Sequence, residues 1–360
     1  MCIRDSNPGA GGGGPYWCGF FVQAPWRTYV NYNDPRLIEK YYSQMKEWFK
    51  YVDKYTVDGL LKRWPDTKYR DWYLGDWLAP MGVDAGNQAS VDLVSNCFIS
   101  ECLSTMYKTA LTLGNKEEAE EFAIRKEKLN KLIHQTFYRA DEGIYSTGSQ
   151  LDMCYPMLVG VVPDSLYNKV KENVVMMTEE KHKGHIAVGL VGVPILTEWA
   201  VRNKQVDFFY QMMKKRDYPG YLYMIDRGAT ATWEYWSGER SRVHNCYNGI
   251  GTWFYQAVGG IRLDEAEPGY RHFYVDPQIP NGVTWAKVTK ESPYGTIAVN
   301  WKLEDDNQLN LQLTVPAGTT ATICIPNNAV SCKMNKKKVS IKKQTVDVEA
   351  GHYEFLFNLK

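Results

Sequence analysis

One glutamate lies inside a run of aromatic residues in the second half of the chain. The segment GATATWEYWSGERSRVHNC, residues 228–246, places Glu234 between Trp233 and Tyr235, and His244 follows ten positions later. Flat apolar rings pack on the faces of sugars, and a carboxylate that is held in place can take or give a proton. These residue types therefore fit a sugar site with a carboxylate base.

A structural interpretation of the same segment stays open beside this one. Thr230 or Thr232 could cap a helix, and Glu234 would then be an ordinary acidic residue of its first turn. A single histidine such as His244 or His185 is more often structural than catalytic.

A second cluster of polar and aromatic residues occurs in YRDWYLGDWLAP, residues 69–80. Asp71, Trp72, Asp76 and Trp77 fall in a predicted loop between helices, where functional side chains concentrate. Aspartate also favours turns through hydrogen bonds to its own backbone. Function and turn formation explain this cluster equally well.

Helical periodicity dominates the chain as far as Gly269. NDP precedes an amphipathic helix from residue 35, whose predicted apolar face is Leu37, Tyr41, Met45, Trp48, Phe49 and Val52. Further helices are predicted at 88–113, 116–138, 150–161, 164–178, 192–202, 205–215 and 245–259. Short connections between them predict a succession of antiparallel helical hairpins.

The period changes to two after Gly269. GTIAVNWKL, QLNLQLTV, TATICIP and YEFLFNL alternate or run apolar between turn-forming stretches, and PNGVTWAKVTKESPYG contains an edge strand. This pattern predicts a small antiparallel β-sandwich, and places a domain boundary near residue 270.

The charge and composition of the chain limit the classes of binding partner to be expected. The chain has 42 Lys and Arg against 41 Asp and Glu, a net charge of +1, which gives no overall field for nucleic acid or for an anionic membrane. No apolar run is long enough to span a bilayer, and no signal-peptide pattern occurs. The expected partner is a neutral or small molecule.

Several chemistries have no motif in this sequence. The 8 cysteines form no CxxC pair or regular framework, so we expect buried free thiols without a zinc site or disulfide scaffold. GAGGGG lacks the lysine of a phosphate loop, and neither HExxH nor GxSxG occurs. The start, MCIRDS, is typical of a cloning or assembly scar.

Taken together and in order, several motifs resemble one family. GPYWCGFFVQAPWRTY, GDWLAP, GATATWE, HNCYNGIGTWFYQAVGG and GIRLDEAEPGYRHF look like the C-terminal part of a bacterial α-L-rhamnosidase of glycoside hydrolase family 78. The resemblance covers nearly the whole chain from about residue 14 onward.

The resemblance implies a fold and a chemistry. Members of that family have a catalytic (α/α)6 toroid of six helical hairpins followed by a β-sandwich. They hydrolyse terminal α-L-rhamnose with inversion, using a glutamic acid as general acid and a glutamate as general base. By this resemblance Glu234, in the TxWE motif, is the general base, and Asp76, Trp77, His244 and Trp17 belong to the rhamnose pocket. No cofactor is implied, because the carboxylate mechanism uses only water.

The sequence also departs from the family. The general acid usually lies in a DERxGW-like motif upstream of the segment that matches GPYW, and this sequence contains none. The helices legible here are fewer than six hairpins require. We therefore expect a non-native or linker start at 1–14, a partial toroid at 15–269 and a β-sandwich at 270–360.

Two consequences are expected from a missing acid and an open ring. The chain should be weakly active or inactive on unactivated rhamnosides, and exposed helix faces should favour aggregation. The alternatives are a catalytically inactive protein that binds rhamnose or another glycan, and a six-hairpin glycosidase or lyase of different sugar specificity.

Overall fold

The computed structural model describes residues 13–64, 73–80, 88–304 and 307–360. The predicted residues Asp71 and Trp72 lie outside the described part of the chain. The described residues form two compact units. One contains 13–26, 38–202 and 208–250, and the other contains 27–37, 203–207 and 251–360.

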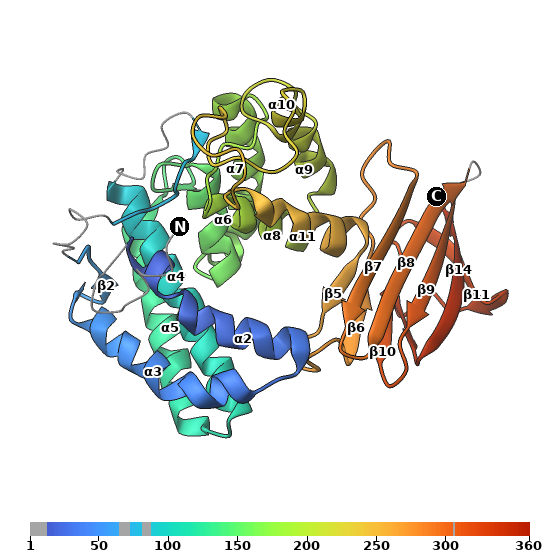
Figure 1. Cartoon of the computed structure of the whole chain (residues 1–360), viewed down its shortest axis with the longest axis horizontal. Coiled ribbons are helices and arrows are strands. Elements are labelled where there is room, and N and C mark those ends of the chain that lie inside the picture. The colour runs from blue at the N-terminus through green and yellow to red at the C-terminus, as the bar shows by residue number, and fades with distance from the viewer. Residues whose placement is uncertain (1–12, 65–72, 81–87, 305–306) are drawn as a thin grey trace. The chain divides into compact units, whose positions relative to one another are not determined.

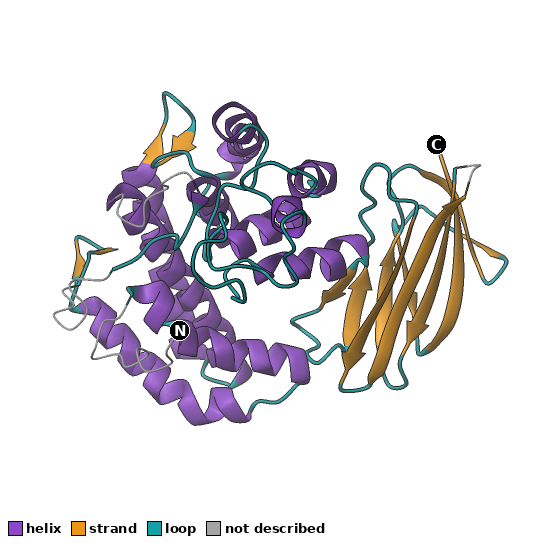
Figure 2. Ribbon diagram, turned by 45° about the horizontal axis from the view of Figure 1, so that its top comes forward, coloured by secondary structure: helices purple, strands orange, loops and turns teal. Residues whose placement is uncertain are grey.

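Helices make up most of the first unit (Figures 1 and 2). The longer helices are α2 (Phe20–Tyr32), α3 (Arg36–Asp53), α4 (Gln88–Thr112), α5 (Lys116–Phe137), α6 (Gln150–Val159), α7 (Asp164–His182), α8 (Gly192–Arg202) and α9 (Val206–Met213). The shorter ones are α1 (Pro15–Cys18), α10 (Tyr221–Ile225) and the turn η3 (Asn248–Ile250), and two strand pairs accompany them: β1 (Thr56–Val57) with β2 (Leu60–Leu61), and β3 (Tyr138–Arg139) with β4 (Ile144–Tyr145). Within the described residues no helix combines the length and apolar character needed to cross a bilayer.

The predicted helices from 35 to 215 are confirmed, with small changes at their ends. The start of α3 is fixed by Asp34, whose carboxylate accepts the backbone N–H of Arg36 at 3.1 Å. Its buried face contains Ile38 and Tyr42, whereas the predicted Leu37 and Tyr41 are more exposed. The apolar stripe is therefore rotated by about one residue near the N-terminus of this helix.

Inner and outer helices differ in how they are buried. Nine of the ten residues of α6 are buried, and α6 packs against α4, α7 and α8. By contrast, α5 packs along α4 and keeps most of its charged side chains in solvent. An alternation of buried and half-exposed helices is what stacked helical hairpins require.

The predicted helix at 245–259 is broken into three pieces. The turn η3 is followed by α11 (Gly251–Trp253) and a five-residue π-helix, η4 (Phe254–Val258). The uniform helix predicted there is therefore wrong in detail, although the segment does coil.

The second unit is a β-sandwich. Its strands are β5 (Ile261–Leu263), β6 (His272–Val275), β7 (Trp285–Ser292), β8 (Gly295–Glu304), β9 (Gln308–Val315), β10 (Thr320–Cys324), β11 (Ala329–Met334), β12 (Lys337–Val339), β13 (Thr345–Val348) and β14 (Gly351–Leu359). One sheet has the order β12-β11-β14-β9-β8-β7 and the other β13-β10-β6-β5.

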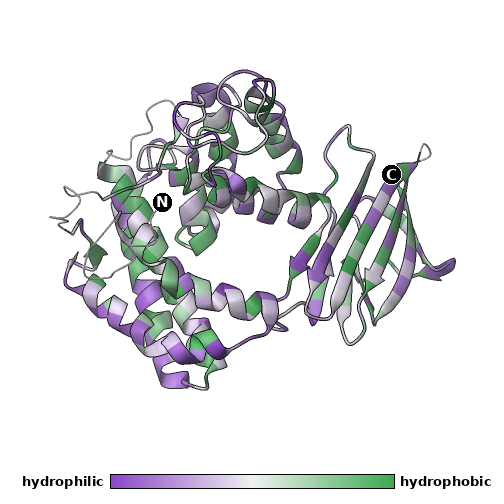
Figure 3. Cartoon of the chain, in the orientation of Figure 1, coloured by the Kyte–Doolittle hydropathy of each residue, from purple (hydrophilic) through white to green (hydrophobic). Residues whose placement is uncertain are grey.

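All neighbouring strands are antiparallel except β6 and β10, which run parallel. The predicted edge strand is β7, at one end of the larger sheet. Along β8, Ile297, Val299 and Trp301 are buried and alternate with more exposed residues, as the predicted period of two requires. Figure 3 shows hydrophilic and hydrophobic residues alternating along strands of this unit.

The free thiols predicted from the cysteine pattern are confirmed in the described residues. No disulfide links the cysteines there, and all but Cys324 are buried.

Candidate active site

The loop that contains Glu234 is not a helix. Residues 230–247 follow α10 in turns and bends, so the interpretation of Glu234 as a first-turn residue capped by Thr230 or Thr232 is wrong. The side chain of Glu234 is half-buried, and no other group in the described part of the chain hydrogen-bonds its carboxylate. That carboxylate is therefore available to a ligand or a water molecule.

Ladder-like hydrogen bonds place the segment that contains His244 beside the segment that contains Glu234. The backbone N–H of Glu234 donates to the carbonyl of Ser241 at 2.9 Å, and that of His244 donates to the carbonyl of Thr232 at 2.8 Å. The Thr232 hydroxyl donates back to the His244 carbonyl at 2.5 Å. Residues 232–234 and 241–244 thus lie side by side although ten positions separate Glu234 from His244.

The tautomer of His244 follows from its surroundings. Its Nδ1 accepts the backbone N–H of Cys246 at 3.1 Å. In the neutral ring the proton is therefore on Nε2, which can donate one hydrogen bond to a hydroxyl. His244 is half-buried, and such a ring suits a binding role.

Tyr247 links the loop of residues 230–247 to the segment that follows Asp76 through hydrogen bonds of its hydroxyl group. Its fully buried hydroxyl lies 2.9 Å from the carbonyl oxygen of Leu78 and 3.1 Å from that of Glu234, and donates to both in a shared hydrogen bond. Its ring stacks on Trp236, with centroids 4.1 Å apart and an interplanar angle of 24°. The two clusters that the sequence singled out are thus joined through one tyrosine.

Trp236 and Tyr221 complete the support under the loop. The Trp236 indole N–H donates to the carbonyl of Val188 at 2.9 Å, and the Tyr221 hydroxyl donates to the carbonyl of Tyr247 at 2.8 Å. Trp233 and Trp236 are both buried. The aromatic residues beside Glu234 therefore hold the loop in place, whereas Tyr235 remains half-buried.

Asp76 is buried, and its carboxylate is hydrogen-bonded by backbone N–H groups. Its carboxylate accepts N–H groups from Gly189 at 2.6 Å, Val191 at 3.0 Å and Gly192 at 2.9 Å. Gly192 is the first residue of α8, so Asp76 satisfies donors at the start of this helix. Because burial outweighs these hydrogen bonds, the pKa of Asp76 is raised to about 6, and the nearby charge of Asp152 adds to this rise.

The residues after Asp76 adopt a strained conformation. Leu78 has φ of 60°, in the left-handed region that non-glycine residues rarely occupy. The carbonyl of Trp77 accepts the N–H of Leu190 at 2.8 Å, and Tyr247 holds the Leu78 carbonyl. The surrounding hydrogen bonds impose this conformation, and Trp77 stays half-buried.

Trp17 is connected to the same region through the backbone. It lies in α1, and Gly13, just before this helix, forms a bridge with Tyr73 and accepts the N–H of Leu74 at 3.1 Å. The indole N–H of Trp17 is buried without a hydrogen-bond partner among the described residues. The structure thus places Trp17 next to the stretch that leads to Asp76.

The negative charges of Glu234 and Asp76 both act on the thiol of Cys246. The pKa of the Cys246 thiol is raised to about 12, first by burial and then by the negative charges of Glu234 and Asp76. Both carboxylates therefore act on one buried thiol, which itself follows His244 by two positions.

Sequence reasoning missed three residues that build this site. Tyr247 lies in the quoted segment HNCYNGIGTWFYQAVGG and Tyr221 in an aromatic stretch, but residue type and spacing did not mark either of them as a site residue. Asp152 lies inside the apolar helix α6, where a buried carboxylate is a visible anomaly. Its oxygens accept hydrogen bonds from Ser90 at 2.7 Å and from the Thr147 hydroxyl at 2.6 Å, and burial raises its pKa.

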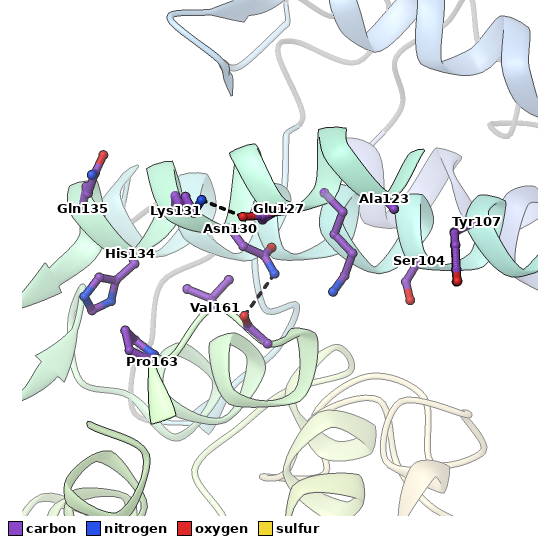
Figure 4. A pocket seen from close by; sticks show the side chains of 12 residues that line it. Ser104, Tyr107, Ala123, Glu127, Asn130, Lys131, His134, Gln135, Val161 and Pro163 are labelled. Carbon is purple, nitrogen blue, oxygen red and sulfur yellow. Dashed lines mark hydrogen bonds and ion pairs between the residues drawn. The ribbon is translucent and has the colours of Figure 1, made fainter. Parts of the chain in front are cut away.

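A separate groove lies elsewhere on the helical unit. A cavity of about 570 Å³ is lined by residues of α4 and α5 and by the loop after α6 (Figure 4). In it Lys131 pairs with Glu127, and the Asn130 amide donates to the backbone beside Val161. None of the five predicted site residues lines this groove, so it is distinct from the cluster around Glu234.

The cluster can perform carboxylate chemistry on a hydroxylated ligand. It combines an unengaged carboxylate at Glu234, an imidazole donor at His244 and the half-buried ring of Tyr235 on a loop fixed by buried aromatic residues. The half-buried ring of Trp77 comes from the segment that Tyr247 links to this loop. Such a site can bind hydroxyl groups and take a proton from water.

The chain is similar in sequence to several α-L-rhamnosidases. The chain is 27% identical to an α-L-rhamnosidase of Alteromonas sp. (strain LOR) and 27% identical to one of Formosa agariphila, each across 92% of the chain. It is 26% identical to the α-L-rhamnosidase of Streptomyces avermitilis across 88% of the chain. The chain spans only 36%, 37% and 30% of these three proteins, about a third of their length.

Solved structures show the same fold. The Streptomyces avermitilis α-L-rhamnosidase complexed with L-rhamnose matches with a TM-score of 0.82 and 22% identity, over 93% of this chain and 32% of that one. The α-L-rhamnosidase from Dictyoglumus thermophilum matches with a TM-score of 0.85 and 20% identity, over 96% of this chain and 40% of that one. The helical unit and sandwich are thus a six-hairpin glycosidase region followed by a β-sheet domain.

Family models agree with this division. Residues 260–340 match the bacterial α-L-rhamnosidase C-terminal domain. Residues 3–258 match the bacterial α-L-rhamnosidase six-hairpin glycosidase domain, and the chain therefore belongs to the bacterial α-L-rhamnosidase family.

Proposed function

We propose that the protein containing this chain removes terminal α-L-rhamnose from glycans or glycosides with inversion. The chain itself spans about a third of the length of the α-L-rhamnosidases that it matches. In this proposal Glu234 is the general base. The carrying observation is that its carboxylate is left unengaged by the described residues while the loop beneath it is fixed by Tyr247 and Trp236.

The proposed step needs two carboxyl groups. Glu234 takes a proton from a water molecule, and the water oxygen forms a bond to the anomeric carbon on the face opposite the leaving group. As the glycosidic C–O bond breaks, a general acid gives its proton to the departing oxygen. An inverting enzyme holds the two groups roughly 6.5–9.5 Å apart to leave space for the water.

The acid is not supplied by Asp76 or Asp152 in this proposal. Asp76 accepts three backbone N–H groups, and Asp152 accepts hydrogen bonds from Ser90 and Thr147. Both carboxyls are fully engaged by the fold. We propose that the acid comes from the part of the relatives' length that this chain does not span.

The other predicted residues take binding or positioning roles. His244 donates from Nε2 to a sugar hydroxyl, and Trp77 and Trp17 provide apolar ring surface for the rhamnose. Asp76 acts through the backbone, because it fixes the 189–192 turn against which Trp77 is held.

The test uses an activated substrate. The leaving group of 2,4-dinitrophenyl α-L-rhamnoside departs without protonation, so its hydrolysis depends on the base and not on the acid. Glu234→Gln should lower turnover by about 10²–10⁴-fold. Glu239→Gln is the matched control, because Glu239 lies on the same loop and is exposed. Proton NMR should show β-L-rhamnose as the first product.

The alternative is a protein that binds rhamnose or another glycan without catalysis. It would be supported if L-rhamnose quenches tryptophan fluorescence while the activated substrate remains intact. Equal turnover in Glu234→Gln and Glu239→Gln would refute the base assignment.

A further inference from the structure

An exposed tryptophan lies on the outer face of the sandwich. Trp285, the first residue of β7, is 61% exposed. Tryptophan is highly buried on average, so this exposure needs a reason. The charged residues of β7, such as Lys287, are explained by its place at the edge of the sheet, where they discourage pairing with another chain. That explanation does not extend to Trp285.

Strand register places polar side chains beside this ring. Trp285 pairs with Lys302 of β8, which pairs with Asn310 of β9. Because cross-strand partners share a face, these three side chains form one row on the outside of the sheet.

A second row lies next to the first. Lys287 pairs with Asn300, and Asn300 pairs with Gln312. The intervening residue of β8, Trp301, is buried on the opposite face. The outer rows are thus separated from the sandwich core by the sheet itself.

The two rows line a shallow cavity of about 430 Å³. This volume lies within the usual range of small-ligand sites, about 300–1,000 Å³. Neighbouring strands are about 4.8 Å apart, so β7, β8 and β9 together present a surface about 10 Å wide, comparable with a disaccharide.

Some of the polar groups on this surface are free for a ligand. Lys302 pairs with Glu304 at 2.7 Å, and the Asn310 amide donates to Glu354 at 3.2 Å. Within the described residues no protein group hydrogen-bonds the side-chain amides of Asn300 and Gln312. An amide offers both a donor and an acceptor, which is what a sugar hydroxyl requires.

We propose that the outer face of β7–β9 binds an oligosaccharide segment of the glycan that carries the rhamnose. Trp285 stacks on the apolar face of one sugar ring, and Asn300 and Gln312 hydrogen-bond hydroxyls of the next. The identity of the glycan rests on the proposed function, whereas the existence of the surface does not. The surface holds a polymer and takes no part in bond cleavage.

Affinity electrophoresis of the full chain in gels that contain gum arabic, a soluble polysaccharide with terminal rhamnose, tests this proposal. The wild-type chain should be retarded relative to a gel without polysaccharide. Trp285→Ala should bind roughly tenfold more weakly, as expected when an aromatic anchor is truncated. Gln312→Ala should bind several-fold more weakly, and Trp285→Phe should recover most of the retardation.

Two further variants separate this surface from other causes. Val330→Ala alters another exposed apolar residue of the sandwich, 51% exposed on β11, and should be retarded like wild type. Glu239→Gln, at an exposed position outside this surface and without a role in the proposed active site, should also be retarded like wild type. Retardation that persists in Trp285→Ala, or a wild-type chain that is not retarded, would overturn the proposal. If Glu234→Gln no longer turns over the activated rhamnoside but is still retarded by the polysaccharide, that result concerns the base assignment and not the surface on β7–β9.

Discussion

The hydroxyl of Tyr247 hydrogen-bonds the backbone carbonyl of Glu234 across 3.1 Å. This bond holds the main chain beneath the carboxylate while leaving the carboxylate itself available. Proton transfer is sensitive to sub-ångström placement, so a group that fixes the backbone of a base contributes to its function without touching the ligand. Tyr247 is therefore a positioning residue in the proposed mechanism.

Removal of this hydroxyl should affect both stability and binding. Tyr247→Phe keeps the ring on Trp236 but leaves the half-buried carbonyls of Glu234 and Leu78 without this donor, which costs about 1–3 kcal/mol. We expect a thermal midpoint several degrees lower. Weaker L-rhamnose binding, measured by tryptophan fluorescence, should accompany it.

The control for this variant is Tyr32→Phe, at a tyrosine that is 65% exposed. It should leave both measurements unchanged. If Tyr247→Phe lowers the midpoint but binds L-rhamnose normally, Tyr247 is structural and does not position the base.

Helices with local signals could be predicted from the sequence. NDP before α3, Gly114 after α4 and the acidic first turn of α5 each mark an end, and the apolar period marks the helix between. In contrast, α2 was not predicted, because Pro25 lies inside it and predicts a break. The parallel pairing of β6 with β10 also has no local signal, because the strands are far apart in the sequence.

The site was predictable in its residue types but not in its construction. GATATWE indicates Glu234, but the loop conformation also depends on contacts of Tyr247 and Trp236 with Leu78 and Val188, which are distant in the sequence. For Asp76, function and turn formation stayed open, and the structure shows a third role. It satisfies backbone donors at the start of α8, more than a hundred residues away. The domain limits at 15–269 and 270–360 stay a prediction.

The raised pKa of Asp76 makes a pH-dependent contribution to stability. Its carboxyl has a pKa of about 6 in the folded chain against an ordinary 3.8, so the folded state binds the proton more tightly than the unfolded state. The stabilising effect of protonation is fully present below about pH 4 and is lost as the pH rises through 6. The loss amounts to about 3 kcal/mol at most.

Comparison with Asp76→Asn isolates this effect, because asparagine does not titrate. The unfolding free energy of wild type minus that of Asp76→Asn should decrease from pH 4 to pH 7, because only the wild type loses the stabilising proton. Asp141→Asn, at an exposed position, is the control for general charge effects. A difference that grows over the same range would mean that the three backbone N–H groups outweigh burial and keep Asp76 ionised.

Close backbone packing at Gly189 gives a prediction for the other side of the site. A Cβ atom added at Gly189 would overlap the carbonyl oxygen of Trp77 and lie 2.6 Å from the backbone nitrogen of Ala79. These are main-chain atoms, so they can make room only if the strained turn at Leu78 moves. Gly189→Ala should therefore weaken the hydrogen bonds from Gly189 to Asp76 and from Leu190 to Trp77.

We expect Gly189→Ala to destabilise the chain by about 1–3 kcal/mol and to weaken L-rhamnose binding at the same time. Thermal unfolding and tryptophan fluorescence measure the two effects. Gly251→Ala is the matched control, because an added Cβ there meets no atom within 4 Å and its φ is not positive. Trp77 and Leu78 link Asp76 to Tyr247. If Gly189→Ala is destabilised but still binds L-rhamnose normally, the 76–78 turn supports the fold and does not shape the rhamnose pocket.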